Sequence, residues 1–270
     1  MKKIILVLTV IFAFSNTSIA QEVKLQEVKE IMEKVADWQI DHFRDSYSRK
    51  KPHHPLDWTN GALYVGMVKW AAMADSEKYY EWLKDIGEEH EWKLHKRKYH
   101  ADDHTVGQMY IELYRKYNDE KMIAPTKEQF NFIRMHPSQS VFNWKTPYHQ
   151  DRWNWCDALF MSPPVWAQLY NLTGDQKYLD FMMEEFKAAT EFLFDKKEHL
   201  YYRDERYMGE LDNGTKIFWS RGNGWVFAGL TNIMNELQPE SKEYKYFLKI
   251  YNKMAKKLLD IQTPEGHWAM

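Results

Sequence analysis

The chain has 270 residues, a formal net charge of -2 and a mean hydropathy of -0.69. The near-neutral charge excludes a basic field for binding nucleic acid, and the low hydropathy excludes a protein that is largely embedded in a membrane. Cys156 is the only cysteine, so an intrachain disulfide is excluded and stability has to come from packing. Aromatic residues make up 16% of the chain, and such rings serve both cores and sugar-binding platforms.

The first 20 residues have the pattern of a signal peptide. Lysines at positions 2 and 3 precede an apolar run over residues 4–14, and small residues at positions 18 and 20 form a cleavage site. The run is too short to span a bilayer as a stop-transfer helix. We therefore expect a protein without a membrane anchor, exported to the periplasm or the extracellular side. A retained N-terminal anchor is the alternative.

The mature part, residues 21–270, is expected to form one all-α domain. Apolar residues recur with a period near 3.6 in most segments, and short polar turns separate these segments. The residues Asp75-Ser76 and Thr126 are expected to cap two of the helices. The predicted helices cover residues 23–43, 58–74, 77–89, 102–117, 126–135, 157–170, 176–194, 222–237 and 241–261.

A repeated unit links these helices. Each unit has a helix rich in small residues, a short turn and a longer amphipathic helix, and the units begin at Trp58, Asp102, Trp155 and Trp219. Such repeats are typical of helical arrays, and the long aromatic loops before the inner helices favour a closed toroid over an open solenoid. Residues 263–270 resemble one more loop of this kind. We therefore expect a partial, C-terminally truncated toroid, the alternative being a natural tail.

Two acidic clusters are candidates for chemistry. Asp157 lies among apolar residues near a predicted helix start, where burial would raise its pKa and suit it to be a general acid. The alternative is a helix-capping aspartate. Asp102 and Asp103, flanked by His100 and His104, could complete a glycosidase carboxylate pair, cap a helix or bind a metal. No third ligand group has a recognisable spacing, so we expect no metal.

A third candidate is the segment from Trp219 to Trp225. Arg221 could bind a carboxylate with two hydrogen bonds, which would indicate an acidic sugar, and Gly222 and Gly224 allow a ligand close to the backbone. Tight helix packing around a buried ion pair is the alternative. Trp58, Asn60 and Trp155 are either core residues or sugar contacts, and Arg203 lies in a charged loop that could face the cavity.

These segments together resemble a known family. The residues Trp-Cys-Asp-Ala-Leu-Phe-Met at 155–161 and Trp-Ser-Arg-Gly-Asn-Gly-Trp at 219–225 are similar to those of the unsaturated rhamnogalacturonyl hydrolases, glycoside hydrolase family 105. Thr59-Asn60-Gly61 and the segment 102–107 fit as well. The resemblance covers essentially all of the mature chain, and the second segment is its most specific motif.

The resemblance implies an (α/α)6 toroid of six helical hairpins, of which roughly four and a half are present. It also implies removal of an unsaturated uronic acid from the non-reducing end of lyase-generated oligosaccharides, without a metal or organic cofactor. Asp157 matches the acid that protonates C4 of the C4=C5 double bond and helps water add at C5. Asp102 matches a second acidic position that contacts the sugar or the water, with Asp103 as the fallback. Trp219 and Arg221 match the ring and guanidinium near the uronate.

The expected substrate-binding residues are Asn60, Asp103, Trp155, Arg203, Trp219, Arg221 and Trp225. One position departs from the family pattern: Arg203 stands where family members carry a histidine, so we expect the sugar beyond the uronate to differ. We expect a monomer whose partner is the oligosaccharide. The alternatives are a noncatalytic carbohydrate-binding toroid, a helical scaffold for protein partners and a toroid glycosidase that acts on saturated sugars.

Overall fold

The computed structural model describes residues 24–46, 50–209 and 211–268, and the predicted signal peptide lies outside them. These residues are mainly α-helical. The helices are α1 (Leu25–Asp41), α2 (Trp58–Ala74), α3 (Glu77–Glu89), α4 (Ala101–His104), α5 (Gly107–Tyr117), α6 (Ala124–Met135), α7 (Ala158–Met161), α8 (Pro163–Thr173), α9 (Gln176–Leu193), α10 (Ser220–Met234) and α11 (Lys242–Asp260). The short strands are β1 (Phe194–Asp195), β2 (Leu200–Tyr201), β3 (Leu211–Asp212) and β4 (Thr215–Lys216).

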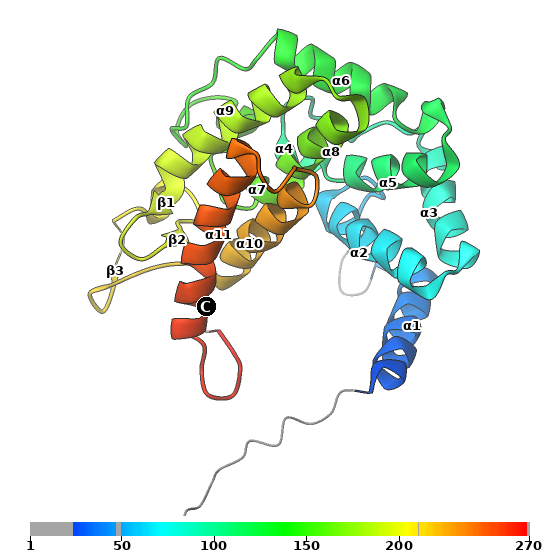
Figure 1. Ribbon diagram of the computed structural model, residues 1–270, viewed down its shortest axis with the longest axis horizontal. Helices are drawn as coiled ribbons and strands as arrows, with labels where there is room; N and C mark the ends of the chain where they lie inside the picture. The colour runs from blue at the N-terminus through cyan, green and yellow to red at the C-terminus, as the bar shows by residue number, and fades with distance from the viewer. Residues whose placement is uncertain (1–23, 47–49, 210, 269–270) are drawn as a thin grey trace, which may run out of the picture.

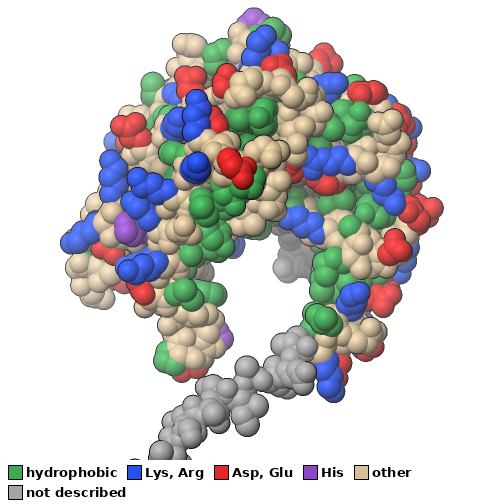
Figure 2. Space-filling view, viewed as in Figure 1, with side chains coloured by type: hydrophobic (Ala, Val, Ile, Leu, Met, Phe, Trp, Pro, Cys, Tyr) green, Lys and Arg blue, Asp and Glu red, His purple; other side chains and the backbone are tan. Residues whose placement is uncertain are grey.

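The helices form an arc of hairpins in two layers (Figure 1). In the inner layer α2 packs against α5, α5 against α8, and α8 against α10. In the outer layer α3 packs on α2, α9 on α8 and α11 on α10. Figure 2 shows the opening between the two ends of the arc, with hydrophobic side chains on both of its sides. The all-α prediction of repeated hairpins is confirmed by this arrangement.

The position of each helix follows from its apolar pattern. On α9, Tyr178, Met182, Phe186 and Ala189 recur at three- and four-residue spacing and are all buried, so one face of this outer helix covers the core. Inner helix α8 is different, because every residue from Pro163 to Leu169 is buried. It is enclosed by neighbouring helices on nearly all sides, as an inner-layer helix must be.

Two inner helices are interrupted where the sequence predicts continuous helices. The predicted helix 102–117 is divided into α4 and α5, and the predicted helix 157–170 is divided into α7 and α8. In the first, the hydroxyl of Thr105 donates to the carbonyl of Asp102 (2.8 Å) and competes with helical bonding. In the second, Pro163 lacks the N–H that would continue the hydrogen bonding of α7, so α7 ends at Met161 and α8 begins at Pro163. Each break leaves a short helix next to the inner layer.

One predicted cap is wrong. Thr126 lies inside α6 and is buried, because that helix already begins at Ala124 with Pro125 in its first turn. Ser76 does stand at the N-cap of α3, although its side chain makes no capping hydrogen bond. Within the described residues no helix is both long and apolar enough to cross a membrane.

Candidate active site

The two short helices bring the acidic clusters together. Asp102 lies on α4, Asp157 lies at the N-cap position of α7, and these two helices are in contact. The side chain of Asp157 makes no capping hydrogen bond, which argues against the capping alternative. The residue is 9% exposed, and the Sγ atom of Cys156 lies 3.6 Å from its Oδ2. Asp157 is therefore a nearly buried carboxyl group that does not cap the helix.

Burial raises the pKa of Asp157 above its ordinary value. Its own backbone N–H and the positive charges of Arg203 and Arg221 oppose this shift without cancelling it. A carboxyl group with a raised pKa holds its proton closer to neutral pH. This is the property that a general acid needs, as the sequence predicts.

Asp102 is the second carboxyl group with a raised pKa, at about 7. Burial is the main cause, and the negative charges of Asp157 and Asp103 add to it, while Arg97 opposes it. His100 does not supply a compensating charge, because burial lowers its own pKa to about 4 and keeps the ring neutral. Asp102 and Asp157 therefore both hold a proton to a higher pH than an exposed aspartate does. The charge of Asp157 adds to the pKa shift of Asp102, as in a coupled acid pair.

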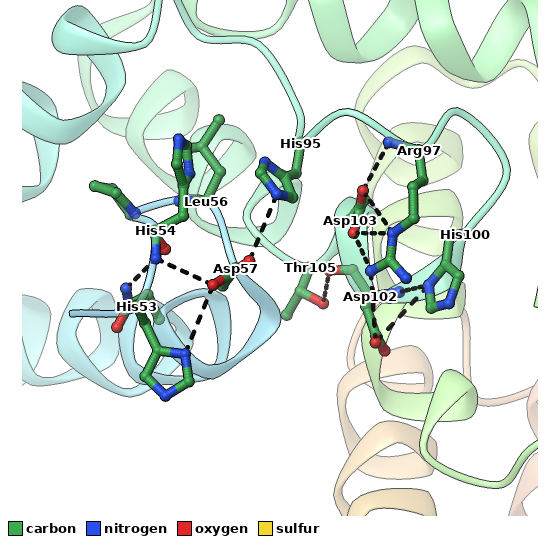
Figure 3. Close-up of polar contacts among 12 residues, drawn as sticks. His53, His54, Leu56, Asp57, His95, Arg97, His100, Asp102, Asp103 and Thr105 are labelled. Atoms are coloured by element: carbon green, nitrogen blue, oxygen red, sulfur yellow. Dashed lines mark hydrogen bonds and ion pairs between the residues drawn. The ribbon is translucent and has the colours of Figure 1, made fainter. Parts of the chain in front are cut away.

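Asp103 has a different environment from its neighbour. Figure 3 shows several bonds between its carboxylate and Arg97, whereas the Asp102 carboxylate has one longer contact with Arg97, at 3.8 Å. Arg97 Nη2 lies 2.5 Å from Oδ1 of Asp103, and the backbone N–H of Arg97 donates to Oδ2 at 2.7 Å. Burial favours a high pKa, but these bonds and the charge of Arg97 hold the pKa of Asp103 below its ordinary value. The structure therefore places Asp103 as the anchor of Arg97, and its contact with substrate stays a prediction.

The histidines near this cluster make hydrogen bonds or ion pairs with other residues. His104 is buried, with Nδ1 2.8 Å from the Ser162 hydroxyl and Nε2 2.8 Å from the Lys98 carbonyl. A second group surrounds Asp57, whose carboxylate lies 3.5 Å from His95 and 3.6 Å from His53 (Figure 3). Among the described residues no three histidine, cysteine or acidic side chains are grouped as metal ligands.

Two cations lie close to the Trp219 ring of the segment 219–225. The guanidinium of Arg221 lies 4.4 Å from the centre of the Trp219 ring, and that of Arg203 lies 5.6 Å from it. Both charges act on Asp157, so this group borders the candidate acid. Arg221 has no acidic partner among the described residues and is exposed, which argues against the buried ion-pair alternative. It also lines a mostly apolar cavity of about 640 Å³ beside α11.

The glycines and the asparagine of this segment explain its geometry. A Cβ atom on Gly222 would lie 2.6 Å from Sγ of Cys156 and 2.7 Å from the Trp219 ring, so only glycine fits there. A Cβ on Gly224 would meet nothing within 4 Å. Asn223 is buried and exchanges hydrogen bonds with the backbone N–H and carbonyl of Tyr201, at 2.8 and 3.0 Å. Asn223 therefore links the start of α10 to Tyr201 in β2, and Tyr201 lies two residues before Arg203.

The remaining predicted contacts lie at the edges of this site. Trp225 packs against Phe160, and its buried Nε1 has no hydrogen-bond partner among the described residues. The contact of Trp225 with substrate therefore stays a prediction. Trp155 is 5% exposed and lies against His100, so most of its ring is used in packing. Asn60, on the first turn of α2, donates to the His54 carbonyl at 3.0 Å.

Sequence reasoning missed Arg97, Asp57 and the neutral state of His100. Arg97 and Asp57 act on Asp102 through their charges, and the His100 ring lies 3.8 Å from its carboxylate. No local pattern marks such residues. For Arg97 and His100 a signal was the density of histidines and charged residues between positions 90 and 104, and for Asp57 it was the pair of histidines at positions 53 and 54.

Comparison with known proteins identifies the family of this chain. The model of glycosyl hydrolase family 88 matches residues 31–270. The chain belongs to glycosyl hydrolase family 88. The predicted resemblance to a glycoside hydrolase family is confirmed at this level, and a solved family 105 glycoside hydrolase from C. acetobutylicum, 20% identical over 89% of this chain and 68% of the other with a TM-score of 0.68, shows the same fold.

Individual members show how far the similarity extends. An unsaturated 3S-rhamnoglycuronyl hydrolase from Alteromonas sp. (strain LOR) is 36% identical over 259 residues, covering 89% of this chain and 62% of that protein. The chain therefore spans less than two thirds of that relative. A solved polysaccharide lyase is 28% identical with a TM-score of 0.78, over 90% of this chain and 69% of the other. A solved family 88 glycosyl hydrolase from Bacteroides vulgatus has a TM-score of 0.74 at 24% identity, over 89% and 70%, and shows the same fold.

Proposed function

We propose that this protein removes an unsaturated uronic acid from the non-reducing end of oligosaccharides produced by polysaccharide lyases. The observation that carries the proposal is Asp157, a nearly buried carboxyl group with a raised pKa next to a second carboxyl group, Asp102. Membership of family 88 and the name of the Alteromonas relative support the same substrate class.

The proposed chemistry is hydration of a double bond. The protonated carboxyl group of Asp157 transfers its proton to C4 of the C4=C5 bond, which leaves positive charge at C5 shared with the ring oxygen. Water then adds at C5 and returns one proton to the Asp157 carboxylate, so the acid is regenerated. The resulting hemiketal opens and releases the adjoining sugar. Asp102 positions the water or a sugar hydroxyl, and Arg221 binds the uronate carboxylate beside the Trp219 ring.

The ultraviolet absorbance of the C4=C5 bond tests this proposal directly. With lyase-made unsaturated disaccharides as substrate, the absorbance should fall over time for the parent protein and stay constant for Asp157→Asn. Asp180→Asn, at an exposed position on outer helix α9, is the matched control and should retain the activity. Continued decay with Asp157→Asn would remove this residue from the role of acid.

A polysaccharide lyase is the second candidate, because one similar solved structure carries that name. A lyase forms the C4=C5 bond during β-elimination, whereas the proposed hydrolase removes it. The same absorbance therefore changes in opposite directions. A rise with intact uronate-containing polysaccharide, and no fall with unsaturated disaccharides, would replace the hydrolase proposal with the lyase.

We also propose that the protein is exported through its N-terminal segment, acts as a monomer and needs neither metal nor organic cofactor. The basic and apolar pattern of residues 1–20 supports export. Cell fractionation tests the location, light scattering after size-exclusion chromatography tests the oligomeric state, and activity after treatment with a chelator tests the metal.

A further inference from the structure

A polar cavity lies among the four inner helices, apart from the group around Trp219. Its volume is about 300 Å³, and side chains from α2, α5, α8 and α10 line it. On α10 it is lined by Asn232 and Glu236, in or just beyond the last turn, whereas Arg221 is in the first turn. Asn232 follows Arg221 by 11 positions, which corresponds to about 16 Å of helix. No described residue lines both this cavity and the one beside Arg221, so the two are separate.

The wall of the polar cavity contains a buried acceptor without a partner. Gln168 on α8 is 6% exposed, and its Oε1 accepts no hydrogen bond from any described residue. The nitrogen of the same amide is engaged, because Nε2 donates to Glu112 Oε1 at 2.8 Å. The amide is thereby oriented with its oxygen unsatisfied. A buried acceptor of this kind costs free energy until a donor reaches it.

The cavity also has a donor with unused capacity. Lys69 on α2 donates to Asn232 Oδ1 on α10 at 2.9 Å. Within the described part of the chain Lys69 has no carboxylate partner. An ammonium group has three N–H donors, so two of them have no acceptor among the described residues.

The charges that line the cavity balance. Arg115 pairs with Glu112 and with Glu236, both at 2.6 Å. Together with Lys69 the lining has two cations and two carboxylates. An anionic ligand would meet the two glutamates, and a cationic ligand would meet Lys69 and Arg115. A neutral ligand avoids both repulsions.

Hydroxyl groups match the unsatisfied atoms. A hydroxyl can accept a hydrogen bond from Lys69 and donate one to the Gln168 oxygen. The lining also includes the apolar side chains of Val65 and Ala72 and the ring of Tyr80, which suit the C–H face of a sugar. The volume is at the lower end of the range of about 300–1,000 Å³ for small-molecule sites, so it suits one sugar ring rather than an oligosaccharide.

We propose that this cavity is a second binding site, which takes a neutral monosaccharide. The hydroxyl groups of the sugar accept from Lys69 and donate to Gln168, and its C–H face lies against the apolar part of the lining. The site is separate from the candidate active site, and the inference does not depend on the proposed hydrolase activity.

Saturation-transfer nuclear magnetic resonance on the whole protein at pH 6 tests the site. The probes are D-glucose, D-galactose and D-mannose, each with its uronate and its 2-amino counterpart. We expect saturable binding of at least one neutral sugar with a Kd of about 1 mM or below. Its anionic and cationic counterparts should each bind at least tenfold more weakly, because each meets a like charge in the cavity.

Variants of the lining locate the binding. Lys69→Met and Gln168→Leu should each weaken it at least tenfold, because each removes a hydrogen-bonding group of the site. Lys29→Met, at an exposed position of α1, is the matched control and should bind like the parent. Ala72→Trp should abolish binding by filling the cavity, whereas Met73→Trp, at the next position and outside the lining, should not. Thermal unfolding checks each variant, and Ala72→Trp, at an exposed position, decides the matter if Gln168→Leu does not fold.

The outcomes separate this site from the candidate active site. Absence of saturable binding for all three neutral sugars would overturn the inference, and so would binding that is unchanged in Lys69→Met and Ala72→Trp. Binding that is lost in Arg221→Gln but retained in Lys69→Met would place the sugar in the candidate active site instead. Tighter binding of a charged counterpart would refute the neutral class of ligand. The absorbance assay tests the hydrolase proposal independently of all these results.

Discussion

The negative charge of Asp157 raises the pKa of Asp102, although the two residues lie 55 positions apart and belong to different helical hairpins. Contact between α4 and α7 makes this coupling possible. Such coupling is reciprocal, because the energy of two interacting charges belongs to the pair. The protonation state of one carboxyl group therefore depends on that of the other.

Removing the charge of Asp157 should lower the pKa of Asp102. In Asp157→Asn we expect Asp102 to titrate below its present value of about 7, while remaining above its ordinary value because it is still buried. Nuclear magnetic resonance of 13C-labelled aspartate carboxyl groups measures this shift. Asp260→Asn, at the exposed end of α11, should leave the titration of Asp102 unchanged. An unshifted Asp102 in Asp157→Asn would show that burial alone sets its pKa.

The raised pKa of Asp102 also predicts how stability changes with pH. The folded protein binds more protons at this residue than the unfolded chain does between about pH 4 and pH 7, so its contribution to stability falls as the pH rises through that range. The Asp102→Asn variant has no titrating group at this position, so it does not lose this contribution to stability as the pH rises. The free energy of unfolding from urea titrations should therefore decline less in the variant between these two pH values, by roughly 2–4 kcal/mol. His104, whose pKa is lowered to about 4, titrates equally in both proteins and cancels in the difference.

The two glycines at the start of α10 should respond in opposite ways to alanine. Gly222→Ala introduces a methyl group against Sγ of Cys156 and the Trp219 ring, so we expect a loss of about 1–3 kcal/mol in stability and a large loss of activity as Trp219 and Arg221 shift. Gly224→Ala meets no atoms and should stabilise the helix by about 0.5–1 kcal/mol. Chemical denaturation and the absorbance assay measure both effects. Equal stability of the two variants would refute the close packing at Gly222.

Asp103 should matter for stability through Arg97. Asp103→Asn weakens the hydrogen bonds of a buried carboxylate to Arg97, whose own side chain is 46% exposed, and we expect a cost of about 1.5–3 kcal/mol. Glu89→Gln breaks the pair with Arg44, in which both side chains are about half exposed, and should cost under about 1 kcal/mol. Thermal and urea unfolding compare the two. If Asp103→Asn were as mild as Glu89→Gln but weakened substrate binding, Asp103 would be a substrate contact after all.

The sequence predicts the bounds of a helix well where the composition changes clearly at both of its ends. The bounds of α2 and α3 coincide with the predicted ranges, because their ends carry clear changes of composition. The interruptions of the inner helices were missed, although Pro163 offered a signal for one of them. Thr105 offered none, because its effect depends on a hydrogen bond to Asp102 that a sequence does not reveal.

The candidate site, too, was predicted only in part from the sequence. Asp157, Asp102, Arg221 and Trp219 were found from motif residues, and they do gather around adjoining elements. Their electrostatic environment was not predictable, because it is set by residues distant in sequence. Arg97, for example, acts on Asp102 and Asp103 from a loop that has no recognisable pattern.

The interruption of two successive inner helices has a consequence for how such a site can arise. α4 precedes α5 in one hairpin as α7 precedes α8 in the next, and each short helix carries one of the two carboxyl groups at or near its first residue. Asp102 and Asp157 thus hold nearly equivalent places in adjacent units of the array. Because α4 and α7 are in contact, the repetition of one local arrangement in two hairpins brings two acids into one site. Duplication of one ancestral unit would suffice to produce both halves of a two-carboxylate centre.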